Sequence, residues 1–67
     1  MLRLRRALDA KGITVKGCAA MIGVSEKAFQ NKLAERNEFT YKEARALKEI
    51  FREYDIDYLL SSDGESA

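Results

Sequence analysis

Residues 15–35, VKGCAAMIGVSEKAFQNKLAE, have the pattern of two short helices joined by a tight turn. In the first half, apolar residues recur at i, i+3, i+4 and i+7, the spacing of one buried helical face. Gly23 follows the last of them, where a residue of positive φ ends a helix, and Ser25 is a favourable N-cap for the next one. Phe29 and Leu33 form the apolar face of that second helix. The stretch therefore predicts two packed helices with a turn at Gly23.

The second helix of this pair has an outer face of mainly polar residues. At about 100° per residue, five positions fall on this face, and none of them is a large apolar residue. They are Glu26, Lys27, Gln30, Asn31 and Ala34. We interpret the face as a surface that reads a polar ligand; the alternative is a helix face that is merely solvated.

The chain has 67 residues, which predicts one domain close to the smallest size that a single apolar core stabilises. Cys18 is the only cysteine, and its place on an apolar helical face indicates a small buried residue in a reducing compartment. No apolar run follows the arginines near the N-terminus, so neither a signal peptide nor a membrane span is expected. We expect a cytoplasmic protein.

The net charge of +1 conceals an uneven distribution along the chain. Residues 1–48 contain eleven Lys and Arg against five Asp and Glu, whereas residues 49–67 contain one against six. Such a division indicates one part that faces a polyanion and another that is turned away from it. A mixed solvated surface is the alternative interpretation.

The sequence on either side of the opening stretch predicts two longer helices. Residues 2–11 form an amphipathic first helix that Gly12 ends. Thr40 and Glu43 match a capping box, because each side chain can bond the backbone N–H of the other residue. The fourth helix is expected to begin after Thr40 and to run to about Glu53.

The C-terminal end predicts a short helix and a tail. Residues 55–60 are expected to form a helical turn, and residues 61–67 a flexible polar tail. No alternation typical of strands occurs in the sequence. The expected fold class is all-α, with five short helices in one domain of residues 1–60 and the turn-linked pair as its second and third helices.

The residue types present give little support to catalysis. The chain has no histidine, so Cys18 lacks an imidazole partner that could activate its thiol. No four-ligand set for zinc exists, and the glycine-rich loop that cradles phosphates in nucleotide-binding proteins is absent. We expect a binding module and not an enzyme, with no cofactor, no metal and no small-molecule ligand.

Four residues of the opening stretch match the spacing of a helix-turn-helix. Ala19 lies four residues before Gly23, and the apolar Val24 and Phe29 follow the glycine at the expected distances. A small residue lets the two helices cross closely, the glycine makes the sharp turn, and the two apolar side chains fill the angle between the helices. The match favours a helix-turn-helix over an ordinary pair of packed helices.

On these residues the chain resembles the phage-repressor and Cro-type helix-turn-helix family, often called the XRE family, and within it the small phage and prophage regulators. The resemblance covers residues 2–60. It rests on Gly12, Ile13, Ala19, Gly23, Val24, Ser25, Glu26, Lys27, Phe29, Asn31, Lys32, Leu33, Glu38, Phe39, Thr40, Glu43, Ala44, Leu47, Lys48, Ile50, Phe51, Asp57, Tyr58, Leu59 and Leu60. It implies a five-helix lambda-repressor-like domain whose third helix, residues 25–35, enters the major groove of DNA.

Two departures from the family pattern bear on packing and on phosphate binding. Many members have an arginine and a glutamate, which form an ion pair, where this chain has Leu8 and Leu33. An apolar contact is expected to replace that pair. The second helix often opens with a glutamine that touches a phosphate; here it opens with Val15, which shifts the expected contact to Lys16.

The resemblance implies a sequence-specific DNA-binding transcriptional regulator, a Cro-like phage or prophage repressor on a palindromic double-stranded operator. The alternative is a protein–protein adaptor, or a phage excision or packaging factor, with the same fold. A weak homodimer through Tyr58 and Leu60 is expected, because two recognition helices read a longer site than one. Ile56 and Leu59 are expected instead to close the core of the monomer.

The expected DNA contacts lie on the third helix and on the segments around it. Those expected at base edges are Glu26, Lys27, Gln30 and Asn31. Those expected at phosphates are Lys16, Ser25, Arg36, Asn37, Lys42 and Arg45. Whether Arg3, Arg5 and Arg6 also touch DNA stays open.

Overall fold

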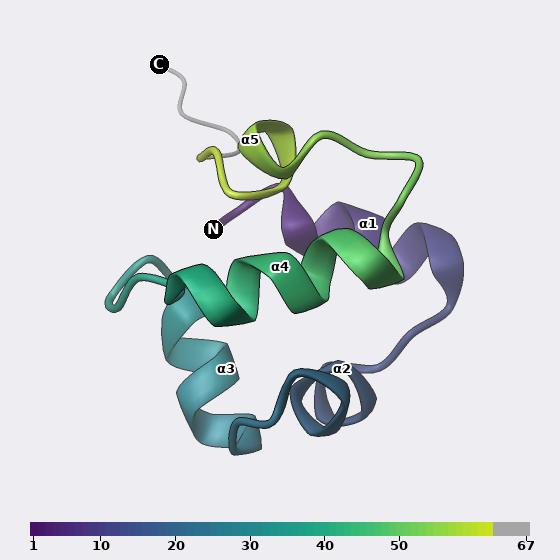
Figure 1. Ribbon diagram of the computed structural model, residues 1–67. Helices are drawn as coiled ribbons and strands as arrows, with labels where there is room; N and C mark the ends of the chain where they lie inside the picture. Colours follow the sequence, from purple (N-terminus) through teal and green to yellow (C-terminus); the bar gives the residue numbers. More distant parts are fainter. Residues whose placement is uncertain (63–67) are drawn as a thin grey trace.

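The computed structural model describes residues 1–62. In this part of the chain it contains five helices, which are α1 (Leu4–Lys11), α2 (Val15–Ile22), α3 (Glu26–Leu33), α4 (Tyr41–Ile50) and α5 (Ile56–Leu59) (Figure 1). Residues 1–62 form no strand, only an isolated bridge between Leu2 and Ser62. The predicted all-α class with five helices is confirmed.

Three helices begin at the hydroxyl N-caps that the sequence marks. The Gly17 N–H donates to Thr14 Oγ1 at 2.9 Å, and the Ala28 N–H donates to Ser25 Oγ at 3.1 Å. At the start of α4 the bonds are reciprocal, from the Glu43 N–H to Thr40 Oγ1 at 3.1 Å and from the Thr40 N–H to Glu43 Oε1 at 3.0 Å. The predicted capping box is therefore present.

Two helices end at the predicted glycines. Gly12 has φ of 69° and Gly23 has φ of 84°, both in the left-handed region that residues with a Cβ rarely adopt. After Gly23 the Val24 N–H returns to the Ala19 carbonyl at 3.0 Å, which closes the turn between α2 and α3.

Three predicted helix boundaries are wrong by two or three residues. α3 ends at Leu33, not at Glu35, because Glu35 takes a left-handed conformation with φ of 67°. α1 begins at Leu4, not at residue 2, because Leu2 leaves the helix and donates its N–H to the Leu33 carbonyl at 2.9 Å. α4 ends at Ile50, not near Glu53, because Phe51 leaves helical geometry and is fully buried. A turn after Phe51 then carries the chain to α5.

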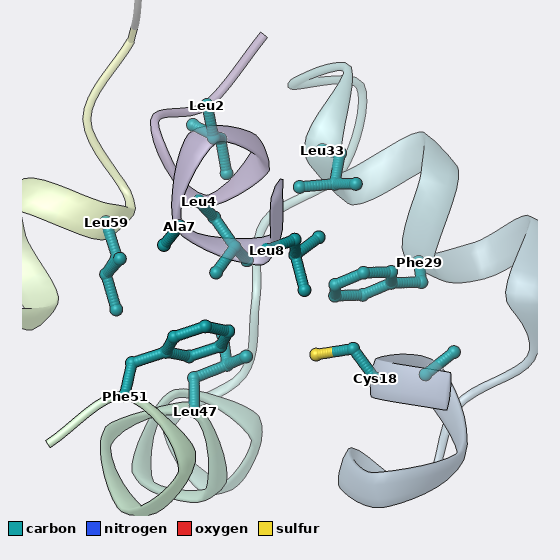
Figure 2. Close-up of a cluster of buried hydrophobic side chains, with 11 residues drawn as sticks. Leu2, Leu4, Ala7, Leu8, Cys18, Phe29, Leu33, Leu47, Phe51 and Leu59 are labelled. Carbon is teal, nitrogen blue, oxygen red and sulfur yellow. The ribbon is translucent and has the colours of Figure 1, made fainter. Parts of the chain in front are cut away.

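The core lies where all five helices meet. Figure 2 shows Leu8 of α1 pointing toward Phe29 and Leu33 of α3, with the Cys18 sulfur directed into the same cluster. Leu8 is 1% and Leu33 is 3% exposed, so both leucines lie in the apolar core. The full cluster is Leu2, Leu4, Ala7, Leu8, Cys18, Ala19, Phe29, Leu33, Leu47, Phe51 and Leu59.

The predicted tail begins too early. Ser61 accepts the Arg3 N–H on its carbonyl at 3.0 Å, and the Ser62 hydroxyl donates to Glu35 Oε2 at 2.8 Å. These bonds join residues 61 and 62 to the body of the domain, so its boundary lies beyond residue 60. The rest of the predicted tail, residues 63–67, lies outside the described residues.

The packing of the helices leaves one side of α3 uncovered. α2 packs against α3 and α4, while α5 packs against α1 and α4. In Figure 1 the end of α3 meets the start of α4, and α2 lies near the start of α3. The remaining side of α3 is the polar face that the sequence singles out.

Candidate nucleic-acid interface

The outer face of α3 exposes three of the four predicted base-reading residues. Glu26, Lys27 and Gln30 are exposed, and Asn31 is half-buried. Phe29 lies on the opposite side of the helix and is fully buried, so the core fixes which face looks outward. Within the described residues Lys27 makes no ion pair with an acidic side chain, which leaves its ammonium available to an external acceptor.

The two ends of α3 already use some of the predicted contact groups within the protein. Ser25 Oγ accepts the Ala28 N–H, so only its own O–H remains to donate to a phosphate. Asn31 Oδ1 accepts from Arg36 Nη1 at 3.4 Å. Two predicted contacts of different kinds, one at a base and one at a phosphate, are therefore joined.

The predicted phosphate contacts fall into two groups. Arg36, Asn37, Lys42 and Arg45 lie on the loop after α3 and on the first turns of α4, and all four are exposed. Arg45 extends over the Tyr41 ring at 5.8 Å from its centre, and that ring is 79% exposed. Lys16 is also exposed but lies apart from this group, in the first turn of α2.

The N-terminal arginines differ in their surroundings. Arg3 Nη1 donates to Ser61 Oγ at 2.6 Å, and the guanidinium lies 5.4 Å from the centre of the Tyr58 ring. Arg5 lies 3.8 Å from the Asp9 carboxylate. Arg6 is exposed. Arg3 is thus held at the end of α5, and Arg5 is paired along α1.

The Lys32 side chain links α3 to α4, although the sequence does not mark it as a site residue. Its ammonium lies 3.2 Å from Glu43 Oε1, donates to the Glu38 carbonyl at 3.0 Å and sits 5.6 Å from the centre of the Phe39 ring. The Lys32 and Glu43 side chains are only 12% and 16% exposed. The pair joins α3 to the capping box of α4, so it sets where the loop between them lies. Its only signal in the sequence is a lysine at the border between the apolar and polar faces of α3.

The Glu43 carboxylate makes this junction sensitive to acid. The Thr40 N–H, and after it the Lys32 ammonium, lower the pKa of Glu43 below its ordinary value of 4.5 against an opposing effect of burial. Because the pKa is lower in the folded state, the stabilisation is present above pH 4.5 and is lost as the pH falls through the folded pKa.

Glu43→Gln should therefore lower the free energy of unfolding by about 1–2 kcal/mol at neutral pH, and by clearly less at pH near 3. Urea denaturation at the two pH values measures both costs. Glu49→Gln is the matched control, because Glu49 is 73% exposed and, among residues 1–62, pairs only with its neighbour Arg52 at 3.6 Å. An equal cost of Glu43→Gln at both pH values would contradict the role of the charge.

Two features outside this face bear on chemistry and on metal binding. Burial raises the pKa of the Cys18 thiol to about 11, so it stays protonated near neutral pH. Residues 1–62 contain no group of three His, Cys, Asp or Glu side chains placed to hold a metal. No helix in this range is long and apolar enough to cross a membrane. Comparison of the chain with protein-family models, curated proteins and solved structures finds no significant match.

Proposed function

We propose that this protein is a sequence-specific DNA-binding transcriptional regulator, a Cro-like repressor of the phage type with a lambda-repressor-like helix-turn-helix. In this proposal α2 and α3 are the helix-turn-helix, and α3 lies in the major groove of a double-stranded operator. The observation that carries the proposal is the outer face of α3, where Lys27 and Gln30 are exposed and point away from the core. Arg36 on the loop after α3 and Lys42 and Arg45 on the first turns of α4 are exposed as well.

The physical argument joins shape to charge. An α-helix fits the major groove of B-DNA, and short polar side chains on its outer face reach base edges that carry a distinct pattern of donors and acceptors. The uneven charge supports this orientation, because residues 1–48 hold eleven of the twelve Lys and Arg. Phosphates beside the groove would be held by Lys16, Lys42 and Arg45, together with backbone N–H groups at the starts of α2 and α4.

Selection of bound sequences from random DNA duplexes tests the proposal directly. We expect enrichment of a palindrome with half-sites about one helical turn apart. If no duplex sequence is enriched, and the protein binds DNA no more strongly than an unrelated protein does, the proposal is overturned in favour of a protein–protein adaptor.

Asn31→Ala should cost about 1–3 kcal/mol of binding free energy at one base pair of each half-site, because Asn31 lies at the end of the face that reads bases. Competition between duplexes that differ at single positions measures this cost. Asn37→Ala is the matched control: Asn37 lies on the loop, so its loss should weaken binding to all sequences alike. An unchanged base preference in Asn31→Ala would contradict the assignment.

Pairing through α5 is the second element of the proposal. Tyr58 is 43% exposed and stacks on Tyr54 with ring centres 6.0 Å apart, so its outer edge is open to a second copy. Leu59 is fully buried, as expected for a core residue, and Ile56 and Leu60 are half-buried against the core. Leu60 therefore contributes less exposed surface than the sequence suggests.

Sedimentation of the protein with a palindromic duplex tests this pairing. We expect two subunits per duplex at saturation, and weaker, less cooperative binding after Tyr58→Ala. One subunit per palindrome at saturation would exclude the dimer. A duplex that contains a single half-site serves as the control for stoichiometry.

A further inference from the structure

The end of α3 repeats a turn that two other helices form with glycine. α1 and α2 end in a residue of left-handed conformation, Gly12 and Gly23, with φ of 69° and 84°. Glu35, the second residue after α3, has the same conformation with φ of 67°, although it has a Cβ. The Glu35 N–H then bonds the Lys32 carbonyl at 3.1 Å, and the Arg36 N–H bonds the Asn31 carbonyl at 2.9 Å.

Distant segments hold this unfavourable conformation in place. The Glu35 carboxylate accepts from the Met1 amine at 2.9 Å and from the Ser62 hydroxyl at 2.8 Å. Both ends of the described chain are thus tied to the residue that closes the turn. The consequence is a defined position for the Arg36 backbone, directly beside Asn31.

The side chains of Asn31 and Arg36 are also in contact, and this contact allows only one orientation of the Asn31 amide. Arg36 Nη1 lies 3.4 Å from Asn31 Oδ1. A guanidinium has only donors, and the amide oxygen is the only side-chain acceptor of asparagine. The Asn31 amide therefore directs its oxygen toward Arg36 and keeps its two N–H donors for another partner.

This orientation changes the base that Asn31 recognises. A free asparagine pairs with adenine by accepting from N6 and donating to N7, which needs the amide oxygen. Guanine instead presents two acceptors, O6 and N7, in the major groove. The Asn31 oxygen faces Arg36, so the amide N–H groups of Asn31 and the remaining N–H groups of Arg36 form a set of donors that matches two acceptors. The second lone pair of the oxygen lies beside the guanidinium charge, which disfavours the approach of the N6 donor of adenine.

We propose that Asn31 and Arg36 act as one unit that reads guanine at the end of α3. The inference rests on the proposed function and adds the base that this part of the helix specifies. It also gives Arg36 a role at a base in place of the role at a phosphate that the sequence predicts. The turn at Glu35 is the structural reason, because it brings the arginine back to the helix that it follows.

Selection from random duplexes with three proteins tests this inference. The position that loses its preference in Asn31→Ala identifies the base pair that Asn31 faces. At this position the unchanged protein should prefer guanine over adenine by roughly tenfold. Arg36→Ala removes the positive charge beside the amide oxygen, so at the same position its preference should move to adenine.

Arg52→Ala is the matched control, because the Arg52 side chain is 81% exposed and contacts only Glu49 among acidic groups in residues 1–62. Its selected sequences should match those of the unchanged protein. Thermal unfolding monitored by circular dichroism checks that Asn31→Ala and Arg36→Ala are folded.

Three results would overturn the inference while leaving DNA binding intact. They are adenine at the Asn31 position in the unchanged protein, an Asn31→Ala profile identical to the unchanged one, and an Arg36→Ala variant that binds more weakly with the same base preference. The third result would return Arg36 to a phosphate. Absence of any enriched sequence with the unchanged protein would overturn the proposed function as well.

Discussion

Phe29→Ala should leave most molecules unfolded at 25 °C. Phe29 is fully buried and packs edge-on against Phe39, with ring centres 5.8 Å apart and an angle of 65° between the rings. Removal of a buried phenylalanine costs about 3–5 kcal/mol, because both the transfer free energy and the contacts around the cavity are lost. A single core of this size supplies no more than about 3–5 kcal/mol of net stability.

Urea denaturation followed by circular dichroism measures the free energy of unfolding in this test. Met21→Ala is the control, because Met21 is also apolar but 57% exposed, and its loss should change stability by no more than about 0.5 kcal/mol. A cooperative transition of Phe29→Ala within about 1 kcal/mol of the unchanged protein would show that α3 does not depend on this side chain. Contacts other than those of Phe29 would then hold α3 against the core.

The local features of the fold were predictable because single residues encode them. Thr14, Ser25 and Thr40 each place a hydroxyl where an orphan N–H group in the first turn of a helix needs an acceptor, and the caps appear at these positions. Gly12 and Gly23 mark helix ends because only glycine takes a left-handed conformation without a steric cost. Neither kind of signal depends on the rest of the chain.

The missed features all depend on contacts between distant segments. The left-handed Glu35 has no mark in the sequence, since its conformation is supported by Met1 and Ser62. The late start of α1 likewise follows from the bond between Leu2 and Leu33, which are 31 positions apart in the chain. Such bonds form only once the helices have packed.

The same division applies to the candidate site. Helical periodicity places Lys27 and Gln30 on the outer face of α3, and both are exposed. It gives no information on which polar side chains bond one another, so the contact between Asn31 and Arg36 was missed. The two side chains come together because the turn after α3 brings Arg36 back to Asn31, and helical periodicity does not predict that turn.

Salt should weaken DNA binding by roughly 10³–10⁴-fold between about 50 mM and about 200 mM. Each Lys or Arg that neutralises a phosphate releases a condensed cation, so the affinity falls as a power of the salt concentration. Three or four such contacts per subunit of a dimer predict a slope of log K against log salt of roughly −5 to −7. Lys16, Lys42 and Arg45 are the exposed cations expected to supply them.

Titration of one palindromic duplex at four or more salt concentrations measures this slope, and Arg45→Ala tests its origin. Because a dimer loses two contacts in that variant, its slope should become less steep by about 2. Arg52→Ala removes the same charge from the opposite, acidic part of the chain and should leave the slope unchanged. A slope near zero in the unchanged protein would mean that phosphates are not contacted, and the exposed cations would then have to serve a protein partner. A steep slope that Arg45→Ala leaves unaltered would instead move the phosphate contacts away from α4 and toward α2.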